Sequence, residues 1–272
     1  MVRKTFGIYS EDLSGCVLFI ETGDEYVACW CKRNDTNTIN AFELFTFKQT
    51  DAYNFENLLK EIQLHSRLLT TTFDKACCIW SNENCICIPT EFYNDDAATS
   101  YMKFMFGNDI ETSFYKNNLH DYEVLAMLPH AASSALRNYQ PINNNIHKYY
   151  QLLKGQQNES EENKIHLVFY YSWFIVSVFK KGALQLIQRF FYRAPEDALY
   201  HVLNICKTYE LPIEELNVYV SGMIDISSPL YETLRGYLNN FSIEPVNKEL
   251  FAAEGFHDYP LHYFASFVQY EV

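Results

Sequence analysis

The chain has 272 residues, of which 34 are acidic and 21 basic, so its formal net charge is −13 at pH 7. A surface with this charge repels polyanions, which argues against nucleic acid as a partner. No uninterrupted apolar run approaches the roughly 20 residues that a membrane helix needs, and the first residues lack the apolar stretch of a signal peptide; we therefore expect a cytoplasmic protein without membrane insertion.

The first predicted elements are three strands and a helix. Residues 17–47 alternate in period two, with turns at Gly23-Asp24 and Asn34-Asp35. Residues 54–69, NFENLLKEIQLHSRLL, carry their apolar side chains on one helical stripe, which predicts a helix lying on the sheet. A change from period two to period 3.6 is typical of a mixed α/β layer.

The next stretch, residues 73–118, predicts a small inserted subdomain with a strand at 76–80, a strand at 85–88 and a helix near 97–106. The first half then resumes with a strand at 122–128, a helix after Pro129 and an extended segment over 142–153. The polar stretch 154–164, KGQQNESEENK, predicts a linker or an exposed hairpin tip. We therefore expect a first half over residues 1–153 and a second over 165–272.

The second half repeats the layout of the first. Residues 165–192 predict three strands and residues 195–209 a helix, which Pro195 opens at a position where its missing N–H costs little. A strand ending in VYVSG, a helix over SSPLYETLRGYL, a return segment FSIEPV and a final helix in the tail follow. The repeat predicts an α/β fold of two ribonuclease H-like halves.

The order of these elements, with strings such as VFKKGALQLIQRFFY and VYVSG, resembles a Bacteroidetes family of unknown function with an actin-like ATPase fold. More distantly it is similar to the actin homologues of pilus assembly and cell division, which also carry a subdomain inserted in their first half. The resemblance implies a duplicated ribonuclease H-like fold. It also implies three turns that would hold a nucleotide, two for its phosphates and one for its adenosine.

The first phosphate turn keeps part of the superfamily pattern. Glu21 and Gly23 supply a carboxylate and a glycine, but the next residue is Asp24. A carboxylate can hold Mg²⁺, whereas a second acid would repel phosphate unless a metal neutralised it.

The other two turns depart further from that pattern. The second phosphate turn holds Tyr170, Tyr171 and Trp173, whose rings would fill the space of a phosphate. The adenosine turn offers Ser221 and Gly222 where two or three glycines are expected. If a nucleotide binds at all, the resemblance implies contacts from Glu21, Gly23, Ser221 and Gly222.

Two function classes follow from this pattern. The first is a non-catalytic interaction or scaffolding module with a protein partner, no catalytic residues and no cofactor, in which Tyr170, Tyr171 and Trp173 anchor the partner as rigid aromatic side chains often do. The second is an active ATPase or sugar-kinase-like enzyme that uses ATP and Mg²⁺. A ribonuclease H-like nuclease would need two more convergent carboxylates, and the net charge opposes it.

The cysteines and histidines indicate structural roles. Eight cysteines without a secretory signal predict reduced thiols. Cys29 with Cys31 and Cys85 with Cys87 could form a zinc site if their strands were neighbours, but C-x-C in strands is unlike the usual zinc turns, and we expect buried small side chains and no metal. For His257, Asp258 and His262 a structural role is favoured over a hydrolytic or metal-binding one.

Overall fold

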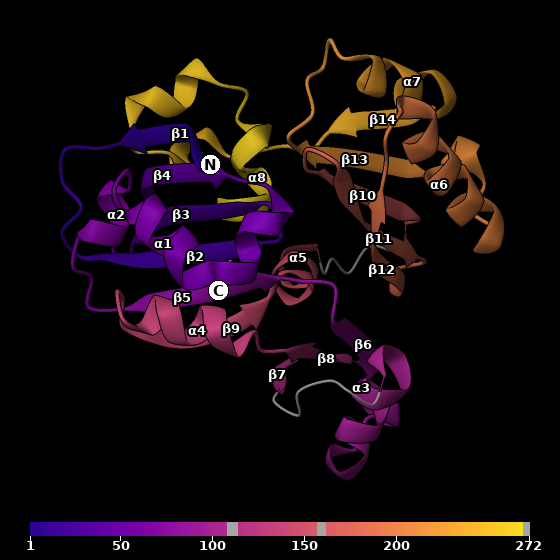
Figure 1. Ribbon diagram of the computed structural model, residues 1–272. Coiled ribbons are helices and arrows are strands. Elements are labelled where there is room, and N and C mark those ends of the chain that lie inside the picture. Colours follow the sequence, from indigo (N-terminus) through magenta and orange to yellow (C-terminus); the bar gives the residue numbers. More distant parts are fainter. Residues whose placement is uncertain (108–113, 157–161, 269–272) are drawn as a thin grey trace. The chain divides into compact units, whose positions relative to one another are not determined.

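The computed structural model describes residues 1–107, 114–156 and 162–268, with the side chains of 51–53 excepted. The chain divides into two compact units (Figure 1), the first formed by Met1–Gln151 with Glu249–Asp258 and the second by Leu152–Lys248 with Tyr259–Val272. The segment 249–258 was expected in the second half. It belongs to the first unit because Phe251 forms a parallel β-bridge with Ile39, and the Ala252 N–H donates to the Ile39 carbonyl at 3.0 Å.

The first unit contains a six-stranded sheet in the order β1-β4-β3-β2-β5-β9. Neighbouring strands from β1 to β2 are antiparallel, and β5 and β9 extend the sheet in parallel. The strands are β1 (Arg3–Tyr9), β2 (Cys16–Gly23), β3 (Tyr26–Arg33), β4 (Ile39–Thr46), β5 (Ala76–Ser81) and β9 (Ile142–His147). The predicted triplet corresponds to β2, β3 and β4, whereas β1 was not expected.

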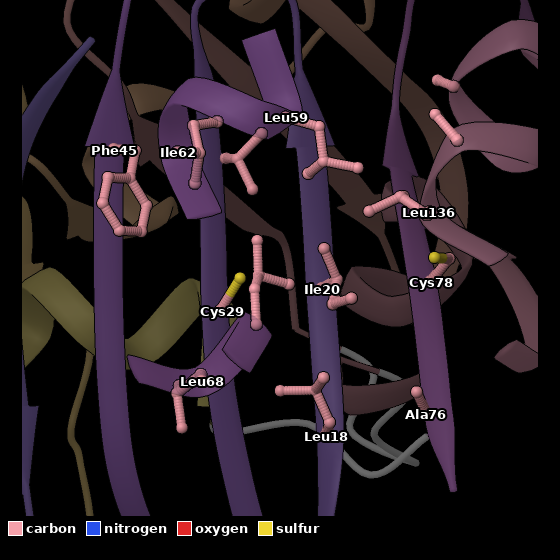
Figure 2. Packing of buried hydrophobic residues seen from close by; sticks show 14 of the residues in the cluster. Leu18, Ile20, Cys29, Phe45, Leu59, Ile62, Leu68, Ala76, Cys78 and Leu136 are labelled. Carbon is pink, nitrogen blue, oxygen red and sulfur yellow. The ribbon is translucent and has the colours of Figure 1, made fainter. Parts of the chain in front are cut away.

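Three helices supply the apolar side chains that pack on one face of this sheet: α1 (Phe55–Gln63), α2 (Arg67–Thr70) and α4 (His130–Arg137). Figure 2 shows Leu59, Ile62 and Leu136 of the helices lying over Ile20 and Cys29 of the strands. The helix predicted over 54–69 is in fact two helices. It is interrupted because the Ser66 hydroxyl accepts from the Leu69 N–H at 2.9 Å and caps α2, as serine does at helix starts.

The inserted subdomain consists of a three-stranded sheet in the order β6-β8-β7 and the α-helix α3. Its elements are β6 (Cys85–Pro89), α3 (Ala98–Phe106), β7 (Phe114–Asn118) and β8 (Tyr122–Met127). The predicted limits 73–118 are therefore wrong at both ends. The strand expected at 76–80 is β5, which is buried and pairs in parallel with β2 in the six-stranded sheet. The strand β8, expected outside the subdomain, lies between β6 and β7.

The second unit contains a five-stranded sheet in the order β12-β11-β10-β13-β14. This order repeats β4-β3-β2-β5-β9 of the first unit, so the predicted duplicated α/β fold is confirmed. The elements are β10 (Lys164–Phe169), β11 (Trp173–Lys180), β12 (Ala183–Phe191), α6 (Pro195–Thr208), β13 (Asn217–Gly222), α7 (Pro229–Tyr237), β14 (Asn240–Ile243) and α8 (His262–Val268). Helices α6 and α7 contribute to the core on β10, β11 and β13, and the predicted final helix, α8, packs against β13.

The segment predicted as extended over 142–153 changes structure in the middle. It is the strand β9 up to His147 and then the helix α5 (Lys148–Gln156). The strand ends there because the His147 Nδ1 accepts the Tyr149 N–H at 3.1 Å, which caps the first turn of the helix. The change places Lys148 at the start of a helix, and this position matters for the site.

Candidate functional site

The first phosphate turn of the first unit contains a buried ion pair. Glu21, near the end of β2, and Lys148, at the start of α5, are both fully buried, and the Lys148 Nζ lies 2.8 Å from the Glu21 Oε2. The Gln151 Oε1 also accepts from Lys148, at 3.0 Å. Burial lowers the pKa of Lys148, and the charge and hydrogen bond of Glu21 oppose that shift. The Glu21 carboxylate, for which the resemblance implies contact with a nucleotide, is thus bonded to a lysine of the same unit.

The second oxygen of Glu21 is also engaged. The Tyr26 hydroxyl, on β3, donates to the Glu21 Oε1 at 2.5 Å. The Tyr26 ring lies over Gly23, so closely that a Cβ at that glycine would come within 2.2 Å of the ring. A glycine in a phosphate turn leaves room for the ligand to approach the backbone. Here the Tyr26 ring occupies the room that Gly23 leaves.

His147, next to Lys148, is held as a neutral ring. It is buried, its Nδ1 accepts the Tyr149 N–H at 3.1 Å, and its Nε2 lies 3.1 Å from the Asn82 carbonyl, which requires the hydrogen on Nε2. Burial lowers the pKa of His147 to about 3, and the neighbouring Lys148 charge adds to the shift. The two bonds fix the start of α5 and hence the position of Lys148.

A second buried carboxylate lies on β4. Glu43 is fully buried and accepts from the Lys4 Nζ at 3.0 Å, the Ser66 Oγ at 2.5 Å and the Arg67 N–H at 2.8 Å, and also from the Tyr9 hydroxyl. Burial raises the pKa of Tyr9, with Glu43 adding to the shift. This network ties β1 and α2 to the sheet.

The second phosphate turn, in the second unit, is filled with aromatic rings. Tyr170 and Trp173 are buried and stack with their centroids 3.8 Å apart and their planes at 18°. Tyr170 also contacts Phe267 of α8 edge to face, at 6.2 Å. Of the three rings expected to anchor a partner, Tyr171 alone is exposed, at 55% of its surface. Tyr170 and Trp173 belong to the core of this unit.

Ser221 and Gly222 end β13 in the same unit. Ser221 is fully buried, and its Oγ has no hydrogen-bond partner among the described residues. Gly222 has a φ of +83°, and a Cβ there would lie 2.2 Å from the Phe169 carbonyl oxygen. Glycine is therefore required by the close approach of β13 to the end of β10, independently of any ligand.

Gly222→Ala is expected to destabilise the protein by about 2 kcal/mol, because alanine is strained at this φ and its Cβ meets backbone. Urea unfolding of the variant against the wild type measures the difference. Gly236→Ala is the matched control, since no atom lies within 4 Å of a Cβ at Gly236 in α7 and alanine favours a helix. A Gly222→Ala protein as stable as the wild type would contradict the close approach.

The cysteine pairs lie on different sheets. Cys29 and Cys31 are on β3 of the six-stranded sheet, and Cys85 and Cys87 are on β6 of the inserted sheet. Burial raises the pKa of the Cys77 and Cys87 thiols to about 12. In the part of the chain that the structure describes, no group of three or more His, Cys, Asp or Glu side chains converges to hold a metal ion.

Among the described residues, no hydrogen bond or ion pair joins His262 to His257 or Asp258. His262 is buried, and its Nε2 bonds the Ile224 carbonyl at 2.8 Å, whereas His257 is exposed. Burial lowers the pKa of His262. The hydrogen bond to Ile224 supports a structural role for His262.

The family is decided by a sequence match over most of the chain. The model of DUF3822, described as a protein of unknown function, matches residues 9–241. The chain belongs to this family. No curated protein matches the chain significantly.

Two solved structures show the fold of this DUF3822 chain. The first is a Bacteroides thetaiotaomicron protein described as having an actin-like ATPase fold and unknown function, with a TM-score of 0.72, 13% identity, and coverage of 85% of this chain and 91% of that one. The second is the PilM-PilN type IV pilus biogenesis complex, with a TM-score of 0.62, 12% identity, and coverage of 92% and 96%. The fold is therefore that of the actin-like ATPases. Within the described residues, no helix is long and apolar enough to cross a membrane.

Sequence reasoning singled out Glu21 and Gly23 and missed the side chains that engage them. Tyr26 could have been found, since a tyrosine three residues after a turn glycine on a two-stranded hairpin lies near that glycine. Lys148 lies 127 residues from Glu21 along the chain, and no local pattern links the two. Glu43 had a weak signal, because it is an acid inside the apolar run AFELFTF.

Proposed function

We propose that this chain is a non-catalytic protein of the actin-like ATPase fold that acts as an interaction or scaffolding module. The observation that carries the proposal is the Glu21 carboxylate, both of whose oxygens are bonded within the first unit, to Lys148 and to Tyr26. If the Glu21 carboxylate turned to bind Mg²⁺, the Lys148 ammonium would stay buried without its counter-charge, which is energetically costly.

The side chains at the two turns that the resemblance assigns to phosphate support the same proposal. The Tyr26 ring occupies the space over Gly23, and Asp24 adds a negative charge beside it. In the second unit, the stacked Tyr170 and Trp173 rings fill the turn that holds phosphate in the superfamily. We therefore propose that the protein works without ATP or Mg²⁺ and is not an enzyme.

A protein partner is supported by the fold and the surface. One similar structure is itself a complex, of PilM with PilN. Tyr171 and Phe191 each expose 55% of their surface, and exposed aromatic side chains are enriched where proteins bind one another. We further propose a cytoplasmic location, because the eight cysteines are all free thiols, as is usual in a reducing compartment.

The rival function is an ATPase or sugar-kinase-like enzyme, and a turnover assay separates the two. We expect phosphate release from Mg-ATP by the purified protein to equal the buffer background, with or without a hexose. The enzyme would be established instead if the wild type hydrolyses ATP, Glu21→Gln abolishes this turnover, and Asp24→Asn, a replacement at a half-buried acid of the same turn, retains it. Because Glu21→Gln removes the charge that balances the buried Lys148, circular dichroism of both variants must first verify that they fold.

Tyr171→Ala is expected to change the free energy of unfolding by no more than about 0.5 kcal/mol, because more than half of the Tyr171 surface is exposed to solvent. Guanidinium unfolding of this variant tests the assignment. A much larger loss would show that Tyr171, like Tyr170, belongs to the core and is not a contact for partners.

A further inference from the structure

The strand β12 forms one edge of the five-stranded sheet. It pairs with β11 on one side, and in the part of the chain that the structure describes no strand pairs with its other side. The pairing is regular from Leu186 to Phe191 and shifts register between Val178 and Phe179 of β11. A regular edge of this kind presents backbone N–H and C=O groups to an added strand.

The register shows which of these groups point outward. The Tyr192 N–H donates to the Ser172 carbonyl at 3.1 Å, so Tyr192 and Ser172 form a hydrogen-bonded pair. Such pairs alternate along an antiparallel ladder. Leu186, Gln188 and Phe190 therefore bond to β11, while the backbone groups of Ile187 and Phe191 face the outer edge.

The first unit shows how the equivalent edge is covered. Its strand β4 holds the same place in the sheet order as β12, and β1 pairs with it antiparallel over Arg3–Tyr9. The covering strand also brings a complementary charge, since the Lys4 Nζ lies 3.0 Å from Glu43 of β4. The second unit has no described counterpart of β1.

The charged residues in and beside β12 indicate what kind of strand would pair with its open edge. Residues 181–193, KGALQLIQRFFYR, contain Lys181, Arg189 and Arg193 and no acid, although the chain as a whole has 34 acidic and 21 basic residues. Lys180, which ends β11, is not counted because its Nζ lies 4.0 Å from the Glu210 carboxylate. The Arg189 guanidinium lies over the Trp173 and Phe191 rings, at 4.3 and 4.7 Å from their centroids. Pairing of two copies of β12 would bring their cations together, which disfavours a second copy of this chain.

We propose that the edge of β12 over Leu186–Phe191 binds an acidic extended segment of a partner protein, which adds to the sheet as an antiparallel strand. Main-chain hydrogen bonds from Ile187 and Phe191 would hold such a strand, and the nearby cations would select acidic side chains. Tyr171 lies at the adjoining turn, next to Ser172, and with Phe191 offers apolar contact at the end of the edge. The proposal rests on the interaction function proposed above and names its partner chemistry and position.

Amide hydrogen exchange followed by NMR tests the pairing on the whole chain. The probe is a synthetic capped peptide of alternating glutamate and valine, long enough to span Leu186–Phe191. We expect a saturating amount to slow exchange of the Ile187 and Phe191 amides by about tenfold or more, while Leu186, Gln188 and Phe190 are protected with and without it. The same peptide with lysine in place of glutamate should bind at least about tenfold more weakly.

Ile187→Pro provides the matched variant, because it removes an N–H that points outward and leaves the ladder to β11 complete. It should weaken binding of the glutamate peptide by about tenfold or more, whereas Ile187→Val should not. If Ile187→Pro fails to fold, the exchange pattern of the wild type still decides.

Unchanged exchange at Ile187 and Phe191, or equal binding of the lysine peptide, would overturn the proposal. If both amides are protected in the free protein, and this protection increases with protein concentration, a second copy of the chain covers the edge. That result would also overturn the proposal. ATP turnover is independent of all these outcomes, so the proposed function and the β12 site can fail separately.

Discussion

Lys148→Met is expected to destabilise the protein by about 3–5 kcal/mol, because it leaves the Glu21 carboxylate buried without its cation. Both side chains are fully buried and lie 2.8 Å apart, so water cannot replace the lost charge without opening the structure. Guanidinium unfolding of the variant and the wild type at pH 7 measures the difference.

Two further variants separate this effect from a general loss of charge. The double replacement Glu21→Leu with Lys148→Met should recover most of the loss, since a buried pair can often be exchanged for apolar side chains of similar size. Lys60→Met breaks the exposed pair between Lys60 and Glu56, and the variant should be nearly as stable as the wild type because solvent screens that pair. A Lys148→Met protein as stable as the Lys60→Met protein would show that Glu21 is not held as a structural ion.

Acid is expected to destabilise the first unit through His147, whose pKa in the folded protein is about 3. In the unfolded chain the pKa returns to 6.5, so between these values the unfolded state binds one more proton. The stability due to neutral His147 is complete above pH 6.5 and is lost as the pH falls through this window. The loss is about 2 kcal/mol at pH 5 and about 4 kcal/mol near pH 3.5.

Urea unfolding of the wild type and His147→Gln between pH 7 and pH 5 tests this expectation. The difference between their pH dependences isolates His147 from His262, whose pKa burial also lowers. His120→Gln is the matched control, because it makes the same replacement at an exposed histidine. Equal slopes for His147→Gln and the wild type would contradict the neutral, buried ring.

The strand triplets and their following helices were predictable because their signals are local. The apolar periods of residues 17–47 and 165–192, bounded by turn residues, correspond to β2–β4 and β10–β12. The limits of the inserted subdomain were not predictable, because β5 and β8 are both short apolar strands. Sequence alone does not say that β5 pairs with β2 and β8 with β6. Pairing of that kind depends on contacts far apart in the chain.

The candidate site shows the same division. Glu21, Gly23, Ser221 and Gly222 could be named from the sequence because the family resemblance assigns the turns that contain them. Their environment depends on distant side chains, so Lys148 was missed and was even placed in an extended segment. The sequence could not decide which of Tyr170, Tyr171 and Trp173 are buried, because an aromatic ring at a turn has the same pattern whether it faces solvent or packs against a helix such as α8.

The most direct test of a nucleotide-independent protein is its thermal unfolding with and without Mg-ATP. A ligand that binds the folded state alone stabilises it by about 2.7 kcal/mol at 100 times its Kd, which raises the melting temperature by several degrees. With Glu21 bonded to Lys148 and Tyr26, we predict the same melting temperature in millimolar Mg-ATP and in Mg²⁺ alone. A rise of several degrees that grows with ATP concentration would contradict this prediction and show that the Glu21 turn still receives a nucleotide.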